Sequence, residues 1–222
     1  MAETTAPGSD EAAVRATEEA AFYHEAALNA AWTGSRLALG GLSFLFGCFI
    51  FAYFYLQTAN GHSMWLPKST TPPQAWYGAT IMALIVVSAL VQTVGLQQIK
   101  GGRKGPWASA AVVALVLGLA AIALQVAELL NLPFQPGQSG FASVFVGFYP
   151  VALVTWVAAM VWLEALVARA RNIPAISFVE QPPTYAETFE VQRFQSSLSS
   201  FTLVWNYLAI VTFIFWLLFY VR

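Results

Sequence analysis

Residues Trp107–Leu130 read WASAAVVALVLGLAAIALQVAELL, and this stretch decides the class of fold. A helix that crosses the hydrocarbon core of a bilayer needs about 20 mostly apolar residues. The stretch is long enough, and its single charged residue, Glu128, stands near its end. It therefore predicts a transmembrane helix.

Four further stretches have the same character, at about residues 37–56, 76–96, 141–167 and 201–221. The whole chain of 222 residues is 58% hydrophobic and only 9% charged, against about 25% charged residues in soluble domains. A soluble protein of this size could not cover so much apolar surface. We predict an all-α membrane protein, a bundle of five transmembrane helices spanning residues 36–222, preceded by a cytoplasmic tail over residues 1–35.

The basic residues predict the orientation, because loops rich in Lys and Arg stay in the cytoplasm. With five spans, the N-terminal tail shares one side of the membrane with the second–third and fourth–fifth connections. That side carries Arg15, Arg36, Lys100, Arg103, Lys104, Arg169, Arg171 and Arg193, whereas the other carries Lys68 and Arg222. We therefore expect a cytoplasmic N-terminus and a C-terminus outside.

Two polar segments flank these spans. From Asp10 to Trp32, apolar residues recur at helical spacing, which predicts a weakly amphipathic helix. It either docks on a partner or membrane surface, or simply extends the first span, and the second reading is favoured. From Asn172 to Ser200, Pro174, Pro182 and Pro183 argue against a long helix. We expect an irregular loop that lies against a neighbouring subunit.

Aromatic and small residues suggest how the helices are placed. Trp and Tyr gather at span ends, as interface anchors do; they are Trp32, Trp65, Trp76, Tyr77, Trp107 and Tyr220. Small residues in the first span (Gly40, Gly41, Gly47) and the third (Gly118) would let helix backbones approach closely.

Metal-binding and catalytic patterns are missing from the sequence. Its two histidines, His24 and His62, lie outside the predicted spans, and its one cysteine, Cys48, has no partner for a disulfide or metal motif. No glycine-rich phosphate loop is present. A net charge of -1 gives no attraction to nucleic acid. We expect no catalytic centre, cofactor or metal in this chain.

Gln125 and Glu128 are the main polar residues inside the predicted bilayer. They stand one helical turn apart, so they share a face. An intramembrane carboxyl indicates function by default. Glu128 is read as a hydrogen-bonded helix clamp, a proton-linked group, or an interfacial residue that reaches water, and the clamp is favoured. For contacts with lipid headgroups or another subunit, the candidates are Arg36, Lys100, Arg103, Lys104 and Trp205.

The third and fourth spans carry a pattern that resembles subunit III of the haem-copper oxidases. It consists of Leu117-Gly118-Leu119, Gln125-Val126-Ala127-Glu128, Pro133-Phe134 and Gly140-Phe141-Ala142-Ser143-Val144-Phe145, at matching spacing. Two weaker matches keep the order: Phe51-Ala52-Tyr53-Phe54-Tyr55-Leu56 and Val204-Trp205-Asn206-Tyr207. Members of this family have seven helices, or five when the first two are absent.

The chain also departs from the family pattern. Asn206 stands where the family has a histidine in its last helix, and Leu42 stands near the position of its membrane carboxylate. Two further family histidines fall near Ala152 and Thr155. Any role of those residues in proton uptake or lipid contact is therefore not carried over, whereas Gln125 and Glu128 match.

The resemblance implies a non-catalytic subunit III of a terminal oxidase in the bacterial plasma (inner) membrane. Such a subunit packs on subunit I, with subunit II and other respiratory subunits nearby, and holds structural phospholipids. Haem and copper would belong to the partner subunits, which reduce oxygen and pump protons. The alternatives are a subunit III-like assembly or accessory protein, such as that of nitric oxide reductase, and an independent channel or transporter.

Overall fold

Five long helices make up nearly all of the described chain, which covers residues 9–67, 71–101, 103–173 and 185–221 of a computed structural model. They are α1 (Ser9–Trp65), α2 (Ala75–Lys100), α3 (Lys104–Leu130), α4 (Gly140–Asn172) and α5 (Tyr185–Tyr220). Each is long and apolar enough to cross a membrane. The predicted all-helical class and the five spans are confirmed within these residues. The side of the membrane on which each end lies stays a prediction.

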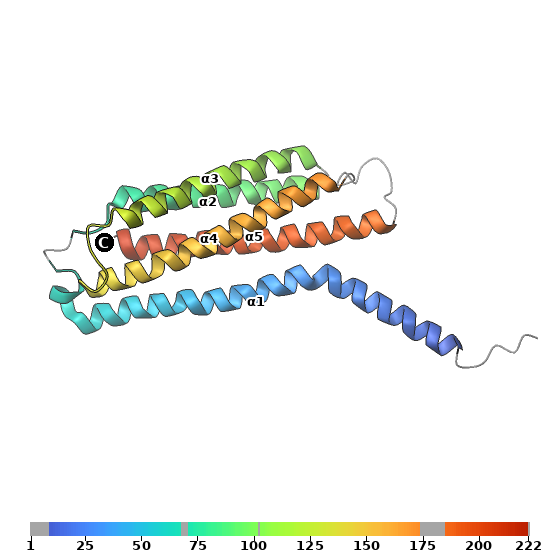
Figure 1. The fold of residues 1–222 in the computed structure, drawn as a ribbon, viewed down its shortest axis with the longest axis horizontal. Helices are drawn as coiled ribbons and strands as arrows, with labels where there is room; N and C mark the ends of the chain where they lie inside the picture. The colour runs from blue at the N-terminus through green and yellow to red at the C-terminus, as the bar shows by residue number, and fades with distance from the viewer. Residues whose placement is uncertain (1–8, 68–70, 102, 174–184, 222) are drawn as a thin grey trace, which may run out of the picture.

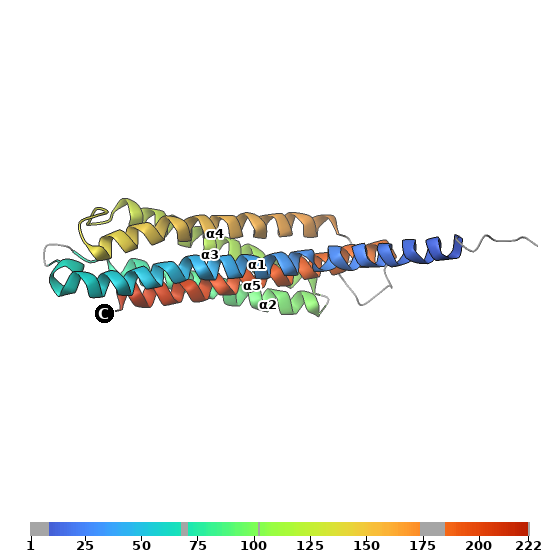
Figure 2. The same ribbon diagram turned by 90° about the horizontal axis from the view of Figure 1, so that it is seen from below.

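The helices run side by side along one long axis (Figures 1 and 2). In Figure 1, α4 and α5 lie between α1 on one side and the α2–α3 pair on the other. Helix α5 packs on α1, α2 and α4, and α4 packs on α1, α3 and α5, so these two helices form the centre of the bundle. The C-terminal ends of α2 and α4 and the N-terminal ends of α3 and α5 lie at the same end of the bundle, so Lys100, Arg103 and Arg169 all lie toward that end.

Helix α1 joins the predicted tail helix and the first span without a break. It is 57 residues long and continues to Trp65, about nine residues beyond the predicted end of the span. Gly61 has a φ of 59° and interrupts the helix near this end, a conformation that glycine adopts without steric cost. The tail helix thus continues directly into the first span, and docking on a partner or membrane surface stays a prediction.

The predicted irregular loop before the last span is wrong over its second half. Residues 174–184 lie outside the described part, but α5 begins at Tyr185, well before the predicted start at residue 201. Val191, Phe194 and Leu198 recur at helical spacing and are fully buried. The prolines end at Pro183, so nothing after them opposes a helix.

Small residues bring some of these helices close together, as helix packing in membranes requires. A methyl group added to Gly95 of α2 would lie 2.9 Å from the Ala110 side chain of α3. At Gly118 of α3, the same addition would lie 2.6 Å from the Met160 sulfur of α4. Gly40, Gly41 and Gly47 of α1 face open space instead, so the chain itself makes no use of them.

Two predicted interface anchors, Trp65 and Trp107, are core residues. Trp107 is 1% exposed, and its ring meets the Phe194 ring edge-on at 5.6 Å. The helical start of α5 covers it, which the irregular-loop prediction had left out. Trp76, in contrast, is exposed at the start of α2.

Candidate functional site: a buried carboxyl between three helices

Glu128 lies at the centre of a polar cluster near one end of the bundle. It is 3% exposed, and two tyrosine hydroxyls donate to its carboxyl group. Tyr149 Oη of α4 lies 2.6 Å from Oε2, and Tyr220 Oη of α5 lies 2.5 Å from Oε1. The two hydroxyls also contact each other. The carboxyl therefore ties α3 to both α4 and α5.

The cluster supports the clamp reading of Glu128. A buried carboxyl group without hydrogen-bond partners would be costly, and each bond that it accepts contributes to stability. Because both oxygens accept a bond from another helix, Glu128 can hold three helices in register. Tyr220 had been predicted as an interface anchor, and Tyr149 had not been singled out. Spacing along one helix gives no signal for such partners.

Gly78 of α2 seats the Tyr220 ring. A methyl group added to Gly78 would lie 2.5 Å from two carbon atoms of this ring, a distance that real contacts do not reach. The absence of a side chain thus allows the ring to lie directly on α2. The hydroxyl that reaches Glu128 is positioned by this contact, which brings a fourth helix into the site.

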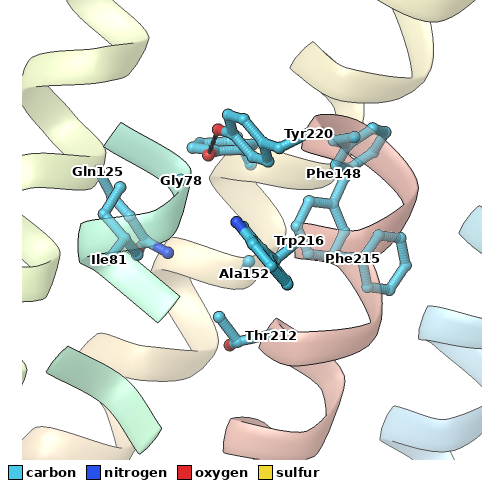
Figure 3. Close-up of a pocket in the computed structure, with 11 residues that line it drawn as sticks. Gly78, Ile81, Gln125, Phe148, Ala152, Thr212, Phe215, Trp216 and Tyr220 are labelled. Carbon is cyan, nitrogen blue, oxygen red and sulfur yellow. Dashed lines mark hydrogen bonds between the residues drawn. The ribbon is translucent and has the colours of Figure 1, made fainter. Parts of the chain in front are cut away.

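A small cavity lies beside the tyrosine pair (Figure 3). Its volume of about 20 Å³ is room for roughly one water molecule. Gln125 and Trp216 face it from opposite sides, and Tyr220 borders it. Gln125 Oε1 and Trp216 Nε1 have no hydrogen-bond partner among the described residues. Gln125 is buried on the same face as Glu128, as predicted, but it does not bond to Glu128.

A second group of polar side chains joins α2 to its neighbours. Ser88 Oγ donates to the Ala114 carbonyl at 2.9 Å and accepts from Trp205 Nε1 at 3.2 Å. Trp205 is 0% exposed. The prediction that it contacts lipid headgroups or a neighbouring subunit is therefore wrong: as the fifth helix is central, its indole packs inward onto α2.

Thr93 and Asn206 form a third polar pair, between α2 and α5. The Thr93 hydroxyl lies 2.8 Å from the Ala89 carbonyl and 3.2 Å from Asn206 Oδ1. Asn206 Nδ2 donates to the same hydroxyl oxygen at 3.1 Å. Both side chains are half-buried. Gln92, the residue directly before Thr93, is fully buried, and neither of its amide atoms has a partner among the described residues.

The four basic candidates lie at the end of the bundle opposite Glu128. Arg36 is exposed, with its guanidinium 4.6 Å from the centre of the Trp32 ring. Lys100 is exposed, and Arg103 is exposed beside Gln98. Lys104 is half-buried and donates to the Ile173 carbonyl at 2.9 Å, which ties α3 to the end of α4. Within the described residues, no three His, Cys, Asp or Glu side chains gather as metal ligands.

No protein-family model matches the sequence, and comparison with curated proteins gives no match. The function is therefore argued from the residue pattern and the site alone. The site is a set of buried hydrogen bonds that hold helices together, with room for about one water molecule.

Proposed function

We propose that this chain is a non-catalytic subunit III of a bacterial haem-copper oxidase. It packs on the catalytic subunit I in the plasma membrane and supports the stability and proton uptake of that subunit. The proposal is carried by the block from Leu117 to Phe145, whose residues and spacing resemble those of that family.

The geometry of the matched residues supports a scaffold role. Gln125 and Glu128 are both buried, and Glu128 accepts hydrogen bonds from two other helices. A residue used in this way stabilises the bundle, which is what a subunit without redox groups must supply to its partner. An apolar groove of about 450 Å³, bordered by Gly41 of α1, Ala158 of α4 and Leu208 of α5, fits the expected phospholipid chains.

Purification from native membranes in a mild detergent tests the proposal. We expect the chain to co-migrate with a larger membrane protein, and the assembly to show haem absorbance. An affinity tag on the N-terminal end of α1, which projects from the bundle (Figure 1), should leave the contacts intact. Recovery of the chain alone, with no haem absorbance in the fraction, would refute the proposal.

A second candidate is an accessory protein of the same family, such as that of nitric oxide reductase. Asn206, which stands in place of a family histidine, and Leu42, which stands near its carboxylate, favour it. Gene neighbours separate the two: genes for oxidase subunits I and II support the first, and denitrification genes support the second. An independent channel would need a polar path, and flux in liposomes that contain only this chain would support that candidate.

A further inference from the structure

An open groove between α2 and α5 carries unused hydrogen-bonding capacity. The groove has a volume of about 460 Å³, and its lining includes Ala89, Leu90, Thr93, Asn206, Ala209 and Phe213. All are apolar except Thr93 and Asn206. The small side chains of Ala89 and Ala209 form its floor, a composition that lets a helix approach closely.

The Asn206 amide is only partly satisfied inside this groove. A primary amide has two N–H donors and an oxygen with two lone pairs. The Thr93 hydroxyl, with one hydrogen to give, lies near both the Ala89 carbonyl and Asn206 Oδ1. Whichever of these two acceptors the Thr93 hydrogen bonds to, Asn206 still has one N–H and at least one oxygen lone pair without a hydrogen bond. Among the described residues, Thr93 is its only hydrogen-bond partner.

This amide lies at membrane depth. Thr93 stands seven residues before Lys100, the only charged residue of α2, so it lies roughly 10 Å deeper along the helix. Asn206 stands thirteen residues after Arg193, the nearest charge before it on α5, or roughly 20 Å deeper. Water does not reach such positions from a lipid-facing surface, and a hydrocarbon chain offers an amide no partner.

The groove bordered by Gly41, Ala158 and Leu208 differs from the α2–α5 groove in its hydrogen bonding. Its only hydroxyl, Thr155 Oγ1, donates to the Ala152 carbonyl of its own helix at 2.7 Å. Apart from the Trp162 indole, the rest of its lining is hydrocarbon, which suits acyl chains. The α2–α5 groove requires a polar occupant as well as an apolar one.

We propose that the α2–α5 groove docks a transmembrane helix of the partner subunit, which presents a Ser, Thr, Asn or Gln side chain to Asn206. The inference rests on the proposed function, since that function supplies the partner. Beyond that function, the inference names the surface of this chain that meets the partner and the kind of side chain that the partner presents there.

Photo-crosslinking in native membranes tests this inference. A photoreactive amino acid replaces Ile210, which borders the groove and is 59% exposed. The control position is Val154 of α4, which is 67% exposed beside Thr155. We expect a crosslink from position 210 to a membrane-spanning protein, which mass spectrometry then identifies, and mainly lipid crosslinks from position 154.

The variant Asn206→Leu then tests the amide. One hydrogen bond between transmembrane helices contributes about 0.6–1.7 kcal/mol, so we expect the crosslink yield and the partner retained in detergent to fall about three- to twentyfold. Thr155→Val, the matched loss of a half-buried polar group, should change neither. The purified Asn206→Leu chain should keep its helix content, which separates docking from folding.

The outcomes distinguish this inference from the proposed function. An Asn206-dependent crosslink to a haem-binding subunit supports both. The same crosslink to another membrane protein without haem supports the docking surface and refutes the oxidase proposal. Crosslinks to lipid alone, to a second copy of this chain, or to a partner whose yield Asn206→Leu leaves unchanged would overturn the inference.

Discussion

Replacing Gly78 with alanine should weaken the hydrogen bonds of Glu128, although Gly78 lies on α2, which does not itself bond to Glu128. The added methyl group would lie 2.5 Å from Tyr220 ring carbons, whereas carbon atoms in ordinary contact lie about 3.5–4.0 Å apart. The ring must therefore retreat by roughly 1 Å. A shift of this size takes the Tyr220 hydroxyl, now 2.5 Å from Glu128, out of good hydrogen-bond range.

The expected cost follows from three contributions. Forcing an extra carbon into a packed site costs about 1–3 kcal/mol. Losing one hydrogen bond between transmembrane helices costs about 0.6–1.7 kcal/mol. Alanine recovers up to about 1 kcal/mol over glycine inside a helix. We expect Gly78→Ala to lower the free energy of unfolding by about 1–4 kcal/mol.

Unfolding of the purified chain in mixed micelles with increasing SDS, followed by tryptophan fluorescence, measures this change. Gly147→Ala is the matched control, since its added methyl group lies 3.5 Å from the Phe49 ring, an ordinary contact. In a Tyr220→Ala background the Gly78→Ala cost should vanish, because the obstructing ring is gone. Equal effects of Gly78→Ala and Gly147→Ala, or a cost that persists without the ring, would refute the reasoning.

Three further predictions concern the buried amide and carboxyl groups and the orientation. Glu128→Gln should lower the free energy of unfolding by less than about 1 kcal/mol, because the new amide offers one acceptor and one donor to the two tyrosine hydroxyls. Glu128→Leu offers neither and should cost about 2 kcal/mol in the same unfolding assay. Equal losses from the two variants would contradict the clamp. Gln92→Leu should be neutral or stabilising by about 1 kcal/mol, since both amide atoms are buried without a described partner, and a clear loss of stability would show that the amide is in use. For orientation, in a Cys48→Ser background, an impermeant thiol reagent added to intact cells should label a cysteine at Gly137 and spare one at Arg103; the reverse pattern would place the N-terminus outside.

Composition and spacing along single helices predicted much of this fold. The apolar stretches located all five helices, and the one-turn separation of Gln125 and Glu128 correctly placed both on a buried face. These predictions are correct because each depends only on a single helix and on the solvent around it. The helical start of α5 also has a signal in the sequence, the apolar spacing of Val191, Phe194 and Leu198, although the preceding prolines favour a loop.

Contacts between helices were not predictable in the same way. Tyr149 and Tyr220 meet Glu128 from other helices, and their partnership depends on helix rotation and depth, which no spacing records. Trp205 was misplaced for the same reason, since its burial follows from the central position of α5. A tryptophan near a span end suits lipid headgroups and a helix core equally well.

The length of α1 has a consequence for the space that the protein occupies. A helix of 57 residues is roughly 85 Å long, while the hydrocarbon core is about 30 Å thick. The part from Ser9 to Ala31, which precedes the predicted first span, accounts for roughly 35 Å of this length. A soluble protein, an antibody or a protease can therefore meet the N-terminal part of α1 ahead of His24 and Leu28, which contact Phe189 and Ser196 of α5.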